Sequence, residues 1–337
     1  LVSNFPTYTL NGKSIYGGRC AVPCPPPAYS ATEYPLMERS AEIAEGIVIP
    51  LGLALCITFI IFRSQRSKYI VFWFTMTYVA MLIMLLVGTS VVSAHPFITC
   101  GGPTVQAQMK GFGLWQSMFL IYFTLCTCNW WLMQAVDIFE KLILGRTLHR
   151  GSPEWHRHSV VMHLFCWITP AISVIALIVG SQLGYNGYMS YAWVAFDQHM
   201  TSDPINLEWA FVFVPLLAVL IIALGLSGVV VYALFNYNHT KGIRKFHAQL
   251  ESNDSLWTKI QAISRLMGYL FVMVFFIAVL IGIRVHTFVG LPVWHRALDR
   301  WGRCLVAEGT DCRIEARLTP QLVALMNVTF SIPGLIM

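Results

Sequence analysis

Charged side chains are scarce in this sequence of 337 residues. Asp, Glu, Lys and Arg together make up 11% of the chain, hydrophobic residues make up 56%, and the mean hydropathy is +0.63. Soluble domains are about one quarter charged, and a water-soluble globule of this length cannot hide so much apolar surface. The scarcity of charge therefore excludes an ordinary soluble protein and predicts an integral membrane protein.

Motifs of catalysis and nucleotide binding are also missing. The sequence has no phosphate-binding glycine loop, no zinc-protease signature, no nucleophile elbow and no pair of carboxylates within an apolar segment. Its 22 basic residues are scattered, so the net charge of +6 leaves no nucleic-acid footprint. No internal repeat is apparent, which disfavours a transporter built from two related halves. We therefore expect no enzyme, no metal site, no cofactor and no nucleic-acid partner.

Seven apolar segments are long enough to cross a bilayer as helices, which takes about 20 residues each. They lie near residues 43–62, 69–92, 112–136, 159–180, 209–235, 263–287 and 318–337. Helices are expected because backbone polar groups must be satisfied within lipid and the alternation of a membrane barrel is absent. The predicted fold class is an all-α seven-transmembrane-helix bundle over 43–337, cut within its seventh helix and preceded by a cysteine-containing linker over 1–42.

Basic residues and cysteines both indicate an N-terminus outside the cell. With that orientation, 12 Lys and Arg residues fall on the inner side and 10 on the outer side, six of the latter in the last outer loop. The inner loops contain no cysteine, and disulfides belong to the oxidising outer side. The predicted outer segments hold Cys20, Cys24, Cys100, Cys304 and Cys312.

The fourth apolar segment carries His163, Trp167 and Pro170 in the stretch HLFCWITPAI. Proline within a helix frees a backbone carbonyl one turn earlier, here that of Cys166, and bends the helix. His163 and Trp167 are four residues apart and face the same side. This pattern favours a packing kink with a hydrogen-bonded histidine, and a proton-relay or ligand role stays open.

Polar residues near the ends of other segments have simpler interpretations. In CTCNWW, residues 126–131, the two thiols point to different sides of a helix, so packing is favoured over a metal site, and Trp130 is expected to contact other helices. Asp137 is expected at the solvated end of the third helix. Arg265 opens the sixth helix, where an interfacial position explains its charge.

Several of these stretches together resemble the Frizzled/Smoothened family of seven-helix receptors. The similar segments are the linker CAVPCPPPAYSATE (20–33), YF followed by NWW (122–131), the pattern H-x-x-x-W-x-x-P (163–170), FVFVPLL (211–217) with Pro215, and Trp294 followed ten residues later by Cys304. The order of the five segments matches that family along almost the whole chain. The three unusual residues of the fourth segment then look like the family's helix-four kink.

The resemblance also implies disulfides and a switch. It pairs Cys24 with Cys100, and Cys304 with Cys312 because the family's usual partner at the end of helix six is missing here. Arg265 matches the basic residue that in the family pairs with a tryptophan at the inner end of helix seven, as a cation–π latch. The extracellular cysteine-rich domain and the disulfide of the second outer loop are absent from this sequence.

The resemblance implies a plasma-membrane receptor that transmits an outer or lipid signal through movement of helix six. Its partners would be membrane lipid, with a bound sterol or other lipid, and a heterotrimeric G protein or another cytosolic effector. Aromatic residues of the outer cup are expected at the ligand: Trp193, Phe196, Trp294 and Trp301. The alternatives are a seven-helix receptor of another class, such as a cyclic-nucleotide-sensing type, a transporter or channel, and a scaffold that does not signal.

Overall fold

The computed structural model describes most of the apolar segments of the chain. The described residues are 8–10, 13–15, 34–61, 66–94, 111–144, 152–180, 183–185, 192–194, 208–235, 268, 272–283, and the single positions 285, 286, 289, 293, 297, 300, 324, 325, 328 and 329. Most of them are helical, and five helices are long and apolar enough to cross a membrane.

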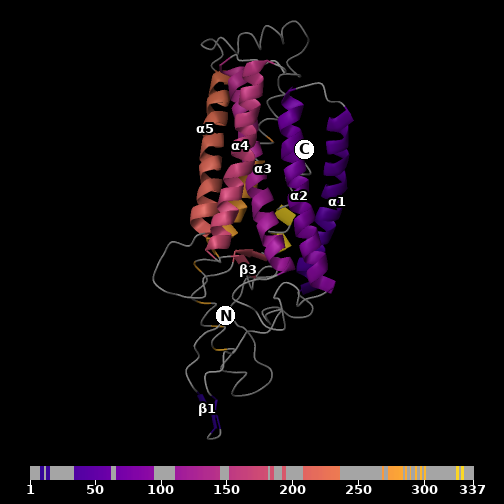
Figure 1. Cartoon of the computed structure of the whole chain (residues 1–337), viewed down its shortest axis with the longest axis vertical. Helices are drawn as coiled ribbons and strands as arrows, with labels where there is room; N and C mark the ends of the chain where they lie inside the picture. Colours follow the sequence, from indigo (N-terminus) through magenta and orange to yellow (C-terminus); the bar gives the residue numbers. More distant parts are fainter. Residues whose placement is uncertain are drawn as a thin grey trace.

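These five helices run side by side as an elongated bundle (Figure 1). They are α1 Tyr34–Ile61, α2 Arg66–Ala94, α3 Phe112–Leu142, α4 Pro153–Val179 and α5 Val214–Phe235, the last preceded by the π-helical turn η1 Trp209–Phe213. A shorter apolar helix spans Val272–Ile283 in the predicted sixth segment, and positions 324, 325, 328 and 329 of the predicted seventh are helical. The predicted helical membrane fold is confirmed.

Two short hairpins that the sequence analysis did not predict accompany the helices. Strands β1 Tyr8–Leu10 and β2 Lys13–Ile15 pair antiparallel, with Tyr8 opposite Ile15. Strands β3 Leu183–Tyr185 and β4 Ala192–Val194 also pair antiparallel, with Leu183 opposite Val194, and both contact α3. The second hairpin therefore lies at the end of the bundle, where β3 is seen in Figure 1.

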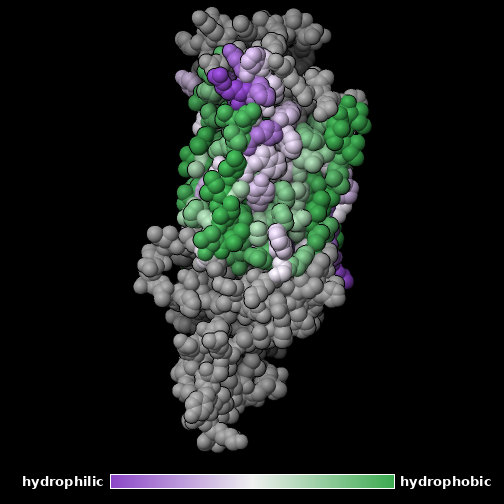
Figure 2. All heavy atoms as spheres, viewed as in Figure 1, coloured by the Kyte–Doolittle hydropathy of each residue, from purple (hydrophilic) through white to green (hydrophobic). Residues whose placement is uncertain are grey.

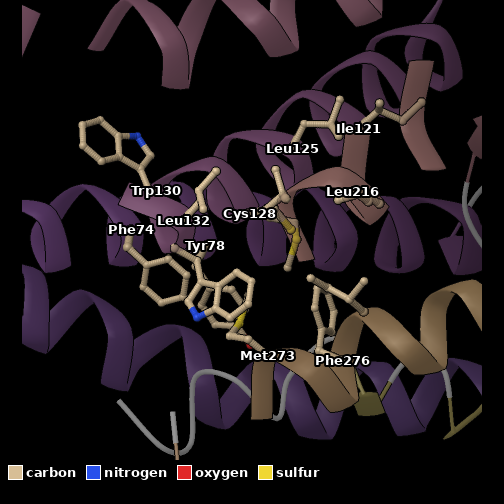
Figure 3. Packing of buried hydrophobic residues seen from close by; sticks show 14 of the residues in the cluster. Phe74, Tyr78, Ile121, Leu125, Cys128, Trp130, Leu132, Leu216, Met273 and Phe276 are labelled. Atoms are coloured by element: carbon tan, nitrogen blue, oxygen red, sulfur yellow. The ribbon is translucent and has the colours of Figure 1, made fainter. Parts of the chain in front are cut away.

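Helix α3 is central, because it contacts α2, α4 and α5. Its Trp130 is fully enclosed, and Phe74 and Tyr78 of α2 are equally buried. Met273 and Phe276 of the helix Val272–Ile283 belong to the same core (Figure 3). Because lipid tails are as apolar as these side chains, close packing and hydrogen bonds hold such helices together rather than removal of surface from water.

The outer surface of the bundle is largely apolar. Many side chains that point away from the core are aliphatic, for example Ile172 and Ile175 of α4 and Ile221 of α5, all more than half exposed. In Figure 2 these helices carry a broad hydrophobic surface. Such a surface is stable against lipid tails and agrees with a multi-pass membrane protein.

A local capping signal sets the start of α4. Ser152 is extended, and its hydroxyl oxygen accepts a hydrogen bond from the backbone N–H of Trp155 at 3.1 Å, while Pro153 occupies the first helical position. The helix therefore begins six residues before the predicted 159. The extra turns bring Trp155 and His158 into α4, next to the end of α3.

Candidate functional site in the aromatic cluster of α2, α3 and α4

Aromatic side chains from three helices meet around His163. We call this group the aromatic cluster, and its members are Tyr69 and Trp73 of α2, Tyr122 and Trp130 of α3, and Trp155, His163 and Trp167 of α4. Two segments singled out in the sequence, YF…NWW and H-x-x-x-W-x-x-P, thus lie against each other. Their contact gives the third and fourth helices a fixed register.

His163 is hydrogen-bonded through both ring nitrogens. Its Nδ1 lies 3.0 Å from Nε1 of Trp167, and its Nε2 lies 2.5 Å from the hydroxyl oxygen of Tyr69. An indole N–H can only donate, so Nδ1 must be the acceptor and carries no proton. The histidine is therefore the neutral tautomer protonated at Nε2, and this N–H donates to Tyr69. Protonation at Nδ1 would break the bond to Trp167.

The rings around His163 pack in well-defined geometries. Trp73 and Trp130 are stacked, with centroids 6.1 Å apart and planes 17° from parallel. His163 meets both edge-on, at 5.3 Å and 88° to Trp73 and at 5.1 Å and 75° to Trp130. Such aromatic pairs each contribute about 0.5–1.5 kcal/mol beyond the area they bury. The cluster therefore binds α2, α3 and α4 into one unit.

Pro170 lies within α4, which continues on both sides of it from Pro153 to Val179. The proline ring has no N–H to give to the carbonyl of Cys166, one turn earlier. The hydroxyl of Tyr122 donates to the neighbouring carbonyl of Trp167 at 3.4 Å. A side chain from α3 thus reaches the backbone of α4 in the turn that the proline weakens, and Pro170 itself is buried.

The match to the family model for the membrane region of Frizzled/Smoothened proteins covers residues 28–337. The chain belongs to the Frizzled/Smoothened family. It is therefore a receptor-type, seven-helix membrane protein, as the resemblance of its motifs predicted. A search of curated proteins found no match. The cluster contains Tyr122 and Trp130 of the helix-three motif and His163 and Trp167 of the helix-four motif. Its other members, Tyr69, Trp73 and Trp155, lie outside both motifs.

A second irregularity lies at the Frizzled/Smoothened fifth-helix motif. Pro215 is half-buried at the start of α5 and cannot donate to the carbonyl of Phe211. The preceding turn η1 is π-helical, and the N–H of Val214 bonds to the carbonyl of Trp209, five residues earlier. Widening the turn in this way avoids the clash of the proline ring with a carbonyl four residues back. Single π turns of this kind often occur at functional sites.

One polar residue of α3 is placed differently from the prediction. Asp137 was expected at a solvated helix end, but α3 continues to Leu142 and the Asp137 side chain is only 5% exposed. It forms an ion pair with Lys141, one turn later. On the next turn Oε2 of Glu140 lies 3.9 Å from Nε2 of His158 in α4, so one polar side chain from each helix approaches the other there. The prediction was wrong because it took the end of the apolar segment as the end of the helix.

The remaining predicted site residues are placed in part or lie outside the described residues. Trp193 is in β4, so the backbone places it at the end of the bundle that carries the β3–β4 hairpin. The residues Arg265, Cys24, Cys100, Cys304, Cys312, Phe196, Trp294 and Trp301 lie outside the described residues, and their roles stay predictions.

The sequence analysis missed several residues, among them Tyr69, Trp73 and Glu45. Tyr69 and Trp73 stand four residues apart at the start of the second apolar segment, and this spacing alone signals a shared aromatic face. Glu45 of α1 is fully enclosed, and neither carboxylate oxygen has a hydrogen-bond partner among the residues that the structure describes. Its position within an apolar segment was the available signal.

Proposed function

We propose that this protein is a plasma-membrane receptor that passes an extracellular or lipid signal to a cytosolic effector, either a heterotrimeric G protein or another protein. The observation that carries the proposal is the family match over residues 28–337, together with the helix-three and helix-four motifs meeting in the aromatic cluster. The N-terminus would lie outside, with a sterol or other lipid and the outer aromatic cup as candidates for the signal and its site.

A receptor needs one rigid part of the bundle and another part whose packing changes. The aromatic cluster supplies the first, because its rings and hydrogen bonds join α2, α3 and α4. Two features favour repacking on the other side: the π turn η1 at the start of α5, and the shorter helix Val272–Ile283 that packs Met273 and Phe276 into the common core. A signal would act by shifting the populations of two such packings.

The switch in this proposal is Arg265, at the inner end of the sixth helix. A cation–π contact of Arg265 with an aromatic residue of helix seven would hold the inactive packing, and such contacts stabilise by about 0.5–2 kcal/mol. Release of the latch lets helix six swing and opens a surface for the effector. A loss of about 1.4 kcal/mol changes the ratio of the two packings about tenfold.

The test uses the complete receptor in cells that carry a panel of G-protein dissociation sensors. Arg265→Ala, at matched surface expression, is expected to raise basal signalling through at least one G protein. Arg157→Ala is the matched control, because Arg157 is an exposed basic residue at the start of α4 and should leave basal signalling unchanged. Silence from both the wild type and Arg265→Ala across the panel would contradict coupling to G proteins and direct the search to another effector.

A further inference from the structure

Aromatic rings continue from the cluster along α3 toward the β3–β4 end of the bundle. Trp115 stacks on Phe119 at 6.0 Å, and Phe119 stacks on Phe123 at 6.1 Å. Phe123 meets Tyr122, and Tyr122 meets Trp167 of the cluster. One unbroken series of ring contacts therefore extends from Trp115 to Tyr69.

Much of this series lies at the surface that would face lipid. Trp115 is 57% exposed and Phe119 is 40% exposed, while Tyr69, Tyr122 and Trp167 are half-buried. In Figure 2 the surface between α4 and α2 shows a band of hydrophilic to intermediate side chains, with hydrophobic helices on both sides. We call the surface formed by these rings the aromatic face, defined by Tyr69, Trp115, Phe119, Tyr122 and Trp167.

The hydroxyl group of Tyr69 is a hydrogen-bond donor of the aromatic face. Because His163 donates to the oxygen of Tyr69, the hydroxyl proton of Tyr69 must point elsewhere. A donor without an acceptor in a membrane protein is costly, so a group that brings only acceptors would fit here.

The depth of Tyr69 in the membrane indicates which chemical group could be this acceptor. Tyr69 is the first residue of the apolar span Tyr69–Gly88, which places it at the membrane boundary where tyrosine side chains meet lipid headgroups. From the level of Trp130 to that of Phe119, α3 rises about 16 Å, since each residue adds about 1.5 Å. This length matches one leaflet of a hydrocarbon core about 30 Å thick.

We propose that the aromatic face is a binding site for a glycerophospholipid, with the hydroxyl of Tyr69 donating to an ester carbonyl. The acyl chain below that ester lies over Trp167, Tyr122 and Phe119. An ester carbonyl is an acceptor only and so suits the hydroxyl donor of Tyr69, whereas a sterol hydroxyl is both a donor and an acceptor. This site is on the outside of the bundle, and it is independent of the receptor function proposed above.

Native mass spectrometry of the purified chain tests the site with two short-chain probes of equal chain length, a diester and a diether phosphatidylcholine. The diether lacks the carbonyl acceptors and is otherwise matched. The first molecule of diester is expected to bind the wild type about fivefold more tightly, which corresponds to one hydrogen bond. Tyr69→Phe should bind the two probes equally.

Tyr232→Phe is the matched control, because Tyr232 of α5 is a 69% exposed tyrosine on another lipid-facing surface. This variant should keep the wild-type preference for the diester. Equal binding of both probes by the wild type would overturn the proposal without any variant. A preference that survives in Tyr69→Phe, or sterol binding that depends on Tyr69 while ester and ether bind equally, would overturn it as well.

Discussion

At the scale of single residues, His163 shows how neighbours fix a protonation state. Trp167 can only donate, so it selects the tautomer of His163 and thereby orients the hydroxyl of Tyr69. The sequence analysis left a packing role and a proton-relay role open. The observed network favours packing, because a proton added at Nδ1 would remove the bond to Trp167 rather than pass along the chain.

Trp167→Phe keeps an aromatic ring but removes the N–H that donates to His163. The variant should lose about 1–2 kcal/mol of stability, since Nδ1 of His163 is left without its donor. Thermal unfolding in lipid nanodiscs measures this loss as a lower midpoint. Trp115→Phe is the matched control, because Trp115 is 57% exposed and no hydrogen bond is recorded for it among the described residues. Equal unfolding midpoints for the two variants would contradict the hydrogen-bond network around His163.

Glu45 is the second residue whose surroundings make a clear prediction. Its carboxyl group is enclosed without a hydrogen-bond partner in the part of the chain that the structure describes, and burying such a polar group costs free energy. Glu45→Met should therefore stabilise the protein, by about 1–3 kcal/mol. Glu42→Met in the exposed position of the same helix should change the unfolding midpoint little. A lower midpoint for Glu45→Met would show that the carboxylate has a favourable partner.

At the scale of elements, the close approach of α1 and α2 depends on Gly52. A Cβ atom at this position would lie 2.4 Å from Cγ2 of Val79 in α2, closer than two carbon atoms can approach. Small residues at such crossings let membrane helices pack closely. The α1–α2 contact is thus set by a glycine rather than by the apolarity of either helix.

Gly52→Ala should force α1 and α2 apart and cost about 1–3 kcal/mol, as overpacking of a close-packed site does. Gly46→Ala is the control within α1, because nothing lies within 4 Å of a Cβ atom there. Thermal unfolding of both variants in the same nanodiscs measures the difference. The packing account fails if Gly52→Ala is no less stable than Gly46→Ala.

The sequence predicted the existence of the helices better than their ends. Apolarity located all five long helices, but it stopped before the polar last turns of α3, and it began six residues late in α4, although Ser152 and Pro153 signal that start. The π turn η1 was missed, because Pro215 marks a disturbed turn without saying how the backbone adapts.

Of the aromatic cluster, His163 and Trp167 were placed on one side of their helix by their spacing alone. Tyr69 and Trp73 could not be joined to them, since contacts between distant helices leave no local pattern.

At the scale of the whole molecule, the orientation in the membrane stays a prediction from basic residues and cysteines. It places the two loop sequons, at Asn238 and Asn253, on the cytosolic side, where glycan cannot be added. Expression through the secretory pathway should therefore give a chain without glycan at either asparagine, measured by glycosidase-sensitive mobility. A chain with a new sequon in the segment 1–42 is the positive control. Glycan at Asn238 or Asn253 would show that the orientation is the reverse of the predicted one.

A second test of the same orientation is whether the predicted disulfides form. If Cys24 pairs with Cys100 and Cys304 with Cys312, peptide mapping without reduction should recover both linked pairs. Cys56, Cys126, Cys128 and Cys166 are buried and free, so they should remain thiols and serve as the internal control. Free thiols at Cys24 and Cys100 would contradict the linkage of the first segment to the bundle.

The central claim is that α2, α3 and α4 form a fixed unit against which helix six moves. Distances between spin labels test it directly, by pulsed electron paramagnetic resonance on the wild type and on Arg265→Ala. One pair, at the exposed positions 144 and 157, reports on α3 and α4. A second pair, at 157 and at 259, four residues before the predicted start of the sixth segment, reports on the inner end of helix six. The account predicts that Arg265→Ala lengthens the second distance and leaves the first unchanged. An unchanged second distance, or equal changes in both, would contradict it.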